Sequence, residues 1–241
     1  MTDVDVSFNT RRVLMFRPAA PSGSELTMTY LTLFFVAAVY LLNGLTLLGR
    51  VDARGAAPIN ILVGLMLLIV TGYLLFPIRD LSLPESRDIV ISSIGYPLFA
   101  FTFLYVGIGN YTNDAGVGLG WYCGWAALVS AFVAMLNFFH FSDVRYGMLW
   151  VVWSVVFAAF FMLSVLNAKR LTRPVGWFVV VAGFTTCAIP GALEMAGYWK
   201  IVPAWISVIS GLATIAVLLL LSLNVEKVSQ SERQASVRRV V

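Results

Sequence analysis

The sequence predicts an all-α, polytopic membrane protein with three helical hairpins and a seventh, C-terminal transmembrane helix. Of its 241 residues 60% are hydrophobic, and the mean hydropathy is +0.88, so a soluble fold would have nowhere to bury its apolar surface. Charged residues make up only 12% and lie almost entirely in the connections and tails. The apolar residues form seven runs of about 20 residues, the length that a membrane-spanning helix requires.

The polar connections set the limits of each expected helix. We expect spans at residues 28–48, 57–76, 89–109, 117–139, 146–166, 174–193 and 201–223. The turn at 110–116 is rich in turn-forming residues, and Pro174 suits a helix start. Pro190 with Gly191 predicts a break in the sixth span, and the polar segment 194–200 is expected to be a turn.

Both ends of the chain are polar. Residues 1–27 lack the apolar core of a signal peptide, so they are expected to be either a disordered tail or an unused stretch upstream of a true start at Met28. Residues 224–241 are expected to be a disordered tail. The predicted organisation is a tail (1–27), a membrane domain (28–195), one additional transmembrane helix (196–223) and a second tail (224–241).

Basic residues favour one orientation in the membrane. Seven spans put the termini on opposite sides, and short cytoplasmic loops are enriched in Lys and Arg. With the N-terminus outside, the cytoplasmic side carries Arg50, Arg54, Lys169, Arg170, Arg173, Lys227, Arg233, Arg238 and Arg239. Besides the N-terminal tail, the outside carries Arg79, Arg87, Arg145 and Lys200. We therefore expect the N-terminus outside and the C-terminus in the cytoplasm.

Asparagines recur near the ends of the odd-numbered spans. Asn43, Asn110 and Asn167 each precede a short turn and an even-numbered span. This pattern divides the first six spans into three hairpins and leaves the seventh as an addition. Asparagine is also common at helix ends, so capping is the simpler interpretation of each residue.

Large side chains recur along single faces of several expected helices. Residues three and four positions apart share a helical face. Three sets meet this rule: Tyr146, Trp150, Trp153 and Phe157 in the fifth span; Leu33, Val36, Tyr40 and Asn43 in the first; and Phe101 and Tyr105 in the third. Lipid needs no aromatic stripe at mid-depth, so the stripes indicate either helix packing or the wall of a narrow passage.

The residues needed for most membrane chemistry are missing from the expected spans. None contains Asp, Glu, Lys or Arg, the groups through which pumps and ion-coupled transporters move charge. A single histidine, His140, rules out bis-histidine haem ligation, and zinc, di-iron and serine-hydrolase sets are incomplete. Cys123 and Cys187 are expected to be buried thiols, and the scattered basic residues give no nucleic-acid footprint. We expect no enzyme, cofactor or metal, which leaves a passage for an uncharged solute or a structural, assembly or sensor subunit.

Short motifs along the chain resemble those of one family. They are YLLNGLTLLGRVD at 40–52, Ile59-Asn60 with Val63-Gly64, FAFTFLY at 99–105, GWYCGW at 120–125, HFSD at 140–143, Trp150 with Trp153, and Ala188-Ile189-Pro190. In this order, over residues 28–195, they resemble the AmiS/UreI family of urea and short-chain amide channels. Each motif is weak by itself, and the ordered set carries the resemblance.

The resemblance implies a six-helix channel core, with a passive channel inside each protomer of a homohexamer in the inner membrane. By motif match it implies pore-lining roles for Leu33, Val36, Tyr40, Phe101, Tyr105, Trp150 and Trp153. Asn43, Tyr146 and Phe157 join this set by shared face or by residue type. The expected solute is urea or an acetamide-like amide, and a cytoplasmic amidase or urease is an expected partner.

Three departures from the family pattern bear on these expectations. The seventh span is additional, and Ala182 stands where the urea channel of the family carries a glutamate, which affects the expected selectivity. Of the outer-loop histidines that resemble a pH sensor in the acid-gated member, only His140 is present. A lone histidine, which ordinarily titrates near about pH 6 to 7, makes a weak gate. We therefore expect weak or no acid gating and a constitutively open channel.

Overall fold

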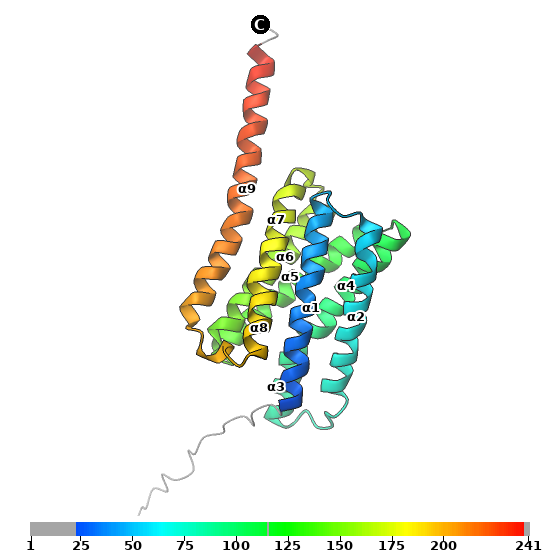
Figure 1. Cartoon of the computed structure of the whole chain (residues 1–241), viewed down its shortest axis with the longest axis vertical. Helices are drawn as coiled ribbons and strands as arrows, with labels where there is room; N and C mark the ends of the chain where they lie inside the picture. Colours follow the sequence, from blue (N-terminus) through cyan, green and yellow to red (C-terminus); the bar gives the residue numbers. More distant parts are fainter. Residues whose placement is uncertain (1–22, 115, 239–241) are drawn as a thin grey trace, which may run out of the picture.

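The chain folds into a bundle of long helices (Figure 1). The computed structural model describes residues 23–114 and 116–238, and every regular element within them is helical. The elements are α1 (Gly23–Leu47), α2 (Ala53–Leu75), α3 (Pro84–Ser93), α4 (Gly95–Thr112), α5 (Gly116–Phe139), α6 (Val144–Ser164), η1 (Lys169–Leu171), α7 (Thr172–Gly183), η2 (Phe184–Ala188), α8 (Ile189–Met195), η3 (Trp199–Ile201) and α9 (Ala204–Arg238). The predicted all-α fold is confirmed.

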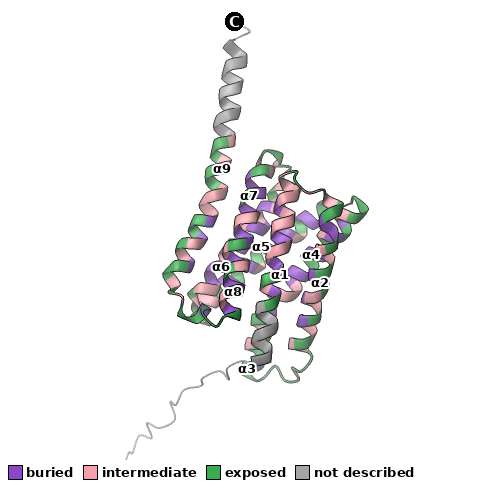
Figure 2. Cartoon of the chain, viewed as in Figure 1, coloured by how far each residue is buried: buried purple, intermediate pink, exposed green. Residues whose placement is uncertain are grey.

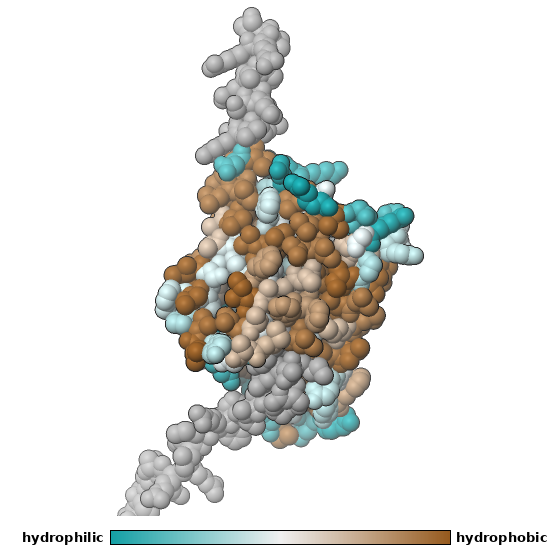
Figure 3. Space-filling model, in the orientation of Figure 1, coloured by the Kyte–Doolittle hydropathy of each residue, from teal (hydrophilic) through white to brown (hydrophobic). Residues whose placement is uncertain are grey.

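The helices have the length and composition of membrane-crossing segments. Six stretches are long and apolar enough to cross: Ala53–Leu75, Pro84–Thr112, Gly116–Phe139, Val144–Ser164, Lys169–Met195 and Ala204–Val225. A shorter apolar stretch, Leu31–Leu47, forms the described apolar part of α1. Figure 3 shows an apolar band across the visible face of the bundle, with polar residues gathered toward its two ends. The chain is a multi-pass membrane protein.

Local sequence explains several helix ends. Asp52 and Asp143 precede α2 and α6, and each carboxylate accepts two backbone N–H groups of the first turn at 2.9 to 3.4 Å. Such caps satisfy N–H groups that have no partner within the helix. Asn167 follows α6 with a φ of 53°, so the capping interpretation fits this residue. It does not fit Asn43 and Asn110, which lie inside α1 and α4.

The sixth crossing contains a wide π turn where the sequence predicts a break. In η2 the N–H of Ile189 donates to the carbonyl of Phe184, five residues earlier. Pro190 has no N–H to donate to the Thr186 carbonyl, and in a regular α-helix its ring would crowd that carbonyl. The π turn relieves this conflict, so α8 runs through Pro190 and Gly191 without a break.

Helices of different hairpins pack together most closely. α2 lies along α4, α5 along α6, and α1 along α7, whereas α4 shares much less contact with α5, and α6 with α7. Glycines permit the close approach of α2 to α4, because a Cβ on Gly107 would lie 2.7 Å from Ile61 Cγ1, and a Cβ on Gly64 would lie 3.1 Å from the Ala100 carbonyl oxygen.

α9 lies against α6 and α7 at the side of the bundle and extends beyond it (Figure 1). Figure 2 shows exposed residues along this helix. The expected disordered tail at 224–241 is corrected, because α9 continues to Arg238. The segment 224–238 contains no Gly or Pro and is rich in residues that favour helices. The expectations for the N-terminal tail fall largely on residues 1–22, which lie outside the described residues.

Candidate functional site

Two cavities lie inside the bundle, and α1, α4 and α6 contribute to the walls of both. The upper cavity, named for its place in Figure 1, has a volume of about 210 Å³ and lies toward the end of α1 at Leu47. The lower cavity has a volume of about 470 Å³ and lies toward the beginning of α1. We treat the two cavities together as the candidate site.

The upper cavity combines aromatic walls with uncharged polar groups. Its polar side chains include Asn43, Thr46, Thr102, Asn110 and Ser164. Among the described residues that line it, none is Asp, Glu, Lys or Arg. The hydroxyl of Tyr40, which also lines this cavity, is buried and has no hydrogen-bond partner among the described residues. A wall of this kind offers hydrogen bonds to a neutral solute and no counter-charge to an ion.

A reciprocal pair of carboxamides supports one wall of the upper cavity. Asn43 Nδ2 donates to Asn60 Oδ1 at 3.0 Å, and Asn60 Nδ2 donates to Asn43 Oδ1 at 2.7 Å. Asn60 is completely buried and also donates to the Ala56 carbonyl at 2.9 Å, whereas Asn43 is partly exposed. The pair links α1 to α2 and fixes the amide group of Asn43 at the cavity.

The lower cavity is more polar and carries charged groups. Asp143, Glu194 and Lys200 line it together with Tyr146. The Tyr146 hydroxyl donates to Glu194 Oε1 at 2.7 Å, and Glu194 is only 8% exposed. The expectation that the membrane spans contain no acidic residue is therefore wrong for Glu194. Because α8 continues to Met195, Glu194 belongs to the sixth crossing rather than to a turn.

Among the described lining residues, Phe99 is the one that both cavities share. Phe99 is 6% exposed, and its centroid lies 5.2 to 6.5 Å from those of five other rings, at separations typical of favourable aromatic pairs. These neighbours are Tyr40, Phe103, Trp150, Trp153 and Phe157. We call Phe99 and these five residues the aromatic junction.

A hydrogen bond fixes one indole of the aromatic junction. Trp153 Nε1 donates to Thr186 Oγ1 at 2.9 Å, and the Thr186 hydroxyl donates to the Ala182 carbonyl at 2.6 Å. Thr186 belongs to the π turn and is 1% exposed. The bond therefore holds the Trp153 indole beside Phe99 and Trp150. Ala182, singled out in the sequence, contributes its backbone to this arrangement.

Eight of the ten side chains singled out as pore-lining candidates line a cavity. Those at the lower cavity are Leu33, Val36, Tyr146, Trp150 and Trp153. Those at the upper cavity are Tyr40, Asn43 and Phe157. The structure thus brings the aromatic faces of α1 and α6 together around one interior space, and the role of these residues in transport stays a prediction.

Phe101 and Tyr105 lie elsewhere. They are 51% and 38% exposed and line neither cavity. The rings of α4 that line a cavity belong to Tyr96, Phe99 and Phe103, which follow one another at helical spacings of three and four. Aromatic residues occupy every second position from 99 to 105, so two faces of this helix carry rings, and spacing could not choose between them. Phe101 and Tyr105, expected to line the interior from α4, therefore give way to Tyr96, Phe99 and Phe103 as the rings that line a cavity.

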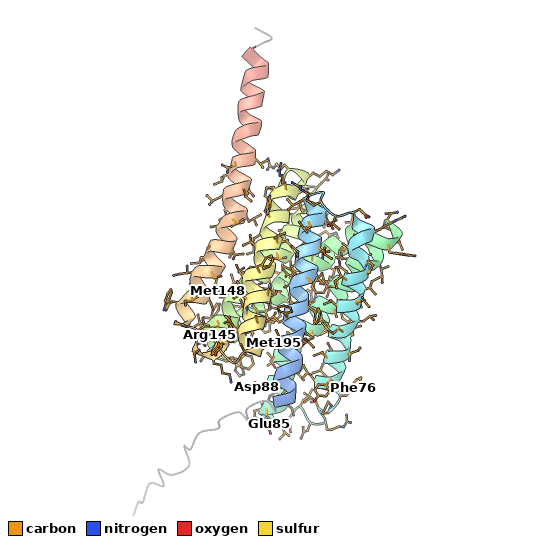
Figure 4. All side chains as sticks on the ribbon, viewed as in Figure 1. Phe76, Glu85, Asp88, Arg145, Met148 and Met195 are labelled. Carbon is orange, nitrogen blue, oxygen red and sulfur yellow. The ribbon has the colours of Figure 1, made fainter. Side chains whose placement is uncertain are left out.

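The single histidine lies outside the lining of both cavities. His140 Nε2 is 2.8 Å from Asp88 Oδ1, and the two side chains are 50% and 35% exposed. This contact connects the segment after α5 to α3, near the end of the bundle where Figure 4 labels Asp88. An exposed pair of this kind contributes about 0–1 kcal/mol, so it holds the two segments together only weakly.

Two cavities that meet inside membrane-crossing helices are the architecture of a membrane channel or transporter. Their walls combine aromatic rings with hydrogen-bonding groups. The chain belongs to the AmiS/UreI family of transporters, whose family model matches residues 28–198. Members of this family are transporters or channels and not enzymes, and the resemblance seen in the sequence is confirmed.

Individual relatives give the same result. A Mycolicibacterium smegmatis protein named as an amidate substrates transporter is 35% identical over 187 residues, which cover 78% of this chain and 85% of that protein. Transporter protein AmiS2 of Rhodococcus erythropolis is 33% identical over 172 residues, covering 71% and 81%. The acid-activated urea channel of Helicobacter pylori is 26% identical over 199 residues, covering 71% and 100%. The solved closed-state urea channel of Helicobacter pylori matches the fold with a TM-score of 0.60 and 22% identity, over 71% of this chain and 99% of that one.

Proposed function

We propose that this protein is a passive channel for urea and short-chain aliphatic amides. The observation that carries the proposal is the aromatic junction, because its six rings line two cavities with hydrogen-bonding walls and one of them, Phe99, belongs to both linings. The names of the relatives, which refer to amidate substrates and to urea, support this solute class.

The proposed path runs from one cavity to the other past Phe99. A solute in the lower cavity exchanges water for hydrogen bonds to groups such as Tyr146 and Glu194. Urea and acetamide are flat, so they can slide along ring faces through the junction. The hydroxyl of Tyr40 and the amides of Asn43 and Asn110 then offer new hydrogen bonds in the upper cavity. An ion finds no counter-charge among the described residues of the upper cavity, and stripping a charge of water costs far more than losing one hydrogen bond.

The channel is proposed to work downhill, with weak or no gating by acid. His140 and Asp88, whose side chains lie 2.8 Å apart, line neither cavity, which supports weak or no gating through this pair.

We also propose the inner membrane as the location, with the N-terminus outside and the C-terminus in the cytoplasm. The basic loop residues at the upper end of the bundle are Arg50, Arg54, Lys169, Arg170 and Arg173. Those at the lower end are Arg79, Arg87, Arg145 and Lys200. The excess at the upper end favours its placement in the cytoplasm. A homohexameric ring and a cytoplasmic amidase or urease as partner stay predictions of family membership.

Stopped-flow light scattering of proteoliposomes tests the proposal. Vesicles with the protein should take up urea and acetamide faster than bare lipid, with a rate proportional to the solute gradient and unaffected by a proton gradient. Uptake no faster than through bare lipid would leave the alternative, a non-transporting structural, assembly or sensor subunit. Acetamide binding to the purified protein would then distinguish a sensor from a structural subunit.

A further inference from the structure

We propose that α9 takes part in solute selection, and that Thr214 is the positioning residue through which it acts. The family match ends at residue 198, and α9 begins at Ala204. Two hydrogen bonds, one made by Thr185 and the other by its chain neighbour Thr186, nevertheless connect this helix through the π turn to the Trp153 indole in the aromatic junction. The inference rests on the proposed channel function and concerns the selectivity of that channel.

Contacts at its N-terminal end fix the position of α9. Arg145 Nε donates to the Val202 carbonyl at 2.6 Å, and its guanidinium also donates to the Lys200 carbonyl at 3.0 Å. A Cβ on Gly211 would lie 2.5 Å from the Met148 side chain, so α9 and α6 are in close contact there. Figure 4 labels Arg145 and Met148 beside the first turns of α9. The helix therefore cannot shift along the bundle without breaking these contacts.

Thr214 connects α9 to the π turn. Its Oγ1 lies 3.0 Å from Thr185 Oγ1, and it is 1% exposed. Each hydroxyl also lies within reach of a carbonyl of its own helix, that of Ser210 for Thr214 and that of Val181 for Thr185. With one proton each, one threonine donates to the other, which donates to its own carbonyl. This arrangement satisfies both hydroxyls only while the two helices stay in register.

The π turn carries this constraint to the junction. Thr185 and Thr186 are neighbours in η2, yet they face different partners, since Thr185 meets α9 and Thr186 accepts from Trp153 at 2.9 Å. A displacement of Thr185 therefore displaces Thr186 as well. The extra residue in the turn leaves it without the regular hydrogen-bond pattern of an α-helix, so an outside partner has more influence on it.

The last residue in this series of contacts, Trp153, lies on the proposed solute path. Trp153 lines the lower cavity, and its ring centroid is 5.2 Å from that of Phe99 and 4.9 Å from that of Trp150. Freeing its indole from Thr186 would allow the ring to rotate, which widens the passage for bulkier amides more than for urea. Thr214 is thus expected to affect the size limit of the channel from outside its walls.

The test compares solutes in proteoliposomes that contain the full chain. We expect Thr214→Val, which keeps the shape and removes the hydroxyl, to raise the ratio of butyramide to urea permeability at least threefold. Thr214→Ser should restore the wild-type ratio, because it returns the hydroxyl. Ser222→Ala is the matched control, since the Ser222 hydroxyl bonds only the Leu218 carbonyl of α9 itself at 2.7 Å, and it should leave the ratio unchanged.

The outcomes separate this inference from the proposed function. Wild-type vesicles no faster than bare lipid would refute the channel itself. A conducting wild type with an unchanged ratio in Thr214→Val would overturn the role of α9, and so would an equal loss of both permeabilities, which indicates a structural effect only. If Thr214→Val does not fold, Thr185→Val removes the same bond from the other side and must raise the ratio in the same way.

Discussion

Replacing Phe99 with alanine should join the upper and lower cavities into one passage. Among the described residues, Phe99 is the one side chain that lines both cavities, of about 210 and 470 Å³, so we infer that its ring forms the partition between them. Water and solute could then remain in contact through the junction. We expect butyramide permeability to rise more than urea permeability, because the bulkier solute is limited more strongly by the ring.

The size of the effect follows from one hydrogen bond. An amide squeezed past apolar rings leaves a polar group without a partner, which costs about 1–3 kcal/mol. Relieving that cost at the barrier corresponds to about a 5- to 150-fold faster passage. The same substitution removes five ring contacts, and buried Phe→Ala changes cost about 3–5 kcal/mol of stability. Phe99→Leu is therefore the milder second variant, with a smaller change in the same direction.

The assay is stopped-flow permeability to urea, acetamide and butyramide at equal protein density. Phe101→Ala provides the matched control, because Phe101 lies on the same helix, is 51% exposed and lines neither cavity. Thermal unfolding in detergent establishes that each variant is folded. A folded Phe99→Ala variant with wild-type permeability to all three solutes would refute the assignment of Phe99 as the barrier.

Three further substitutions test other parts of the site. Tyr40→Phe removes a buried hydroxyl at the junction and should lower acetamide permeability about 2- to 10-fold, the equivalent of one net hydrogen bond. Unchanged permeability would exclude a hydrogen bond between this hydroxyl and the solute. Tyr146→Phe removes the hydroxyl that donates to Glu194 at 2.7 Å, so it should lower the unfolding free energy, measured in detergent melts, by about 1.5–3 kcal/mol. Glu194→Gln keeps an accepting oxygen for this hydroxyl and should lower the unfolding free energy less. His140→Ala should leave urea permeability the same at pH 5 and pH 7.5, because neither His140 nor Asp88 lines a cavity. A large acid-dependent increase in wild-type permeability that this variant abolishes would contradict ungated passage.

Much of the bundle could be predicted because membrane-crossing helices leave a strong mark on sequence. The run expected at 146–166 corresponds to α6 at Val144–Ser164, since lipid requires a long apolar segment and Asp143 marks its start. The inward faces of α1 and α6 were predictable for a related reason. On these helices the large side chains recur every three or four residues, and this spacing places them on a single face.

Other features depend on contacts that are distant in sequence. On α4, rings alternate over two faces, and only packing against α2 decides that Phe99 faces inward and Phe101 outward. Glu194 reads as part of a polar turn, but the π turn before Pro190 keeps the helix intact and leaves this carboxylate against Tyr146. No local pattern reveals that hydrogen bond, because its two residues lie 48 positions apart.

The reciprocal pair of Asn43 and Asn60 has a consequence for how fast a molecule can leave the upper cavity. Two primary amides bonded head to head are the same dimer that an amide solute would form with either of them. An acetamide molecule that bonds the carboxamide of Asn43 therefore competes with the carboxamide of Asn60, which is the same functional group held in place by the chain. In the proposed channel this competition would shorten residence at this position, as rapid permeation requires of any binding site along a pore.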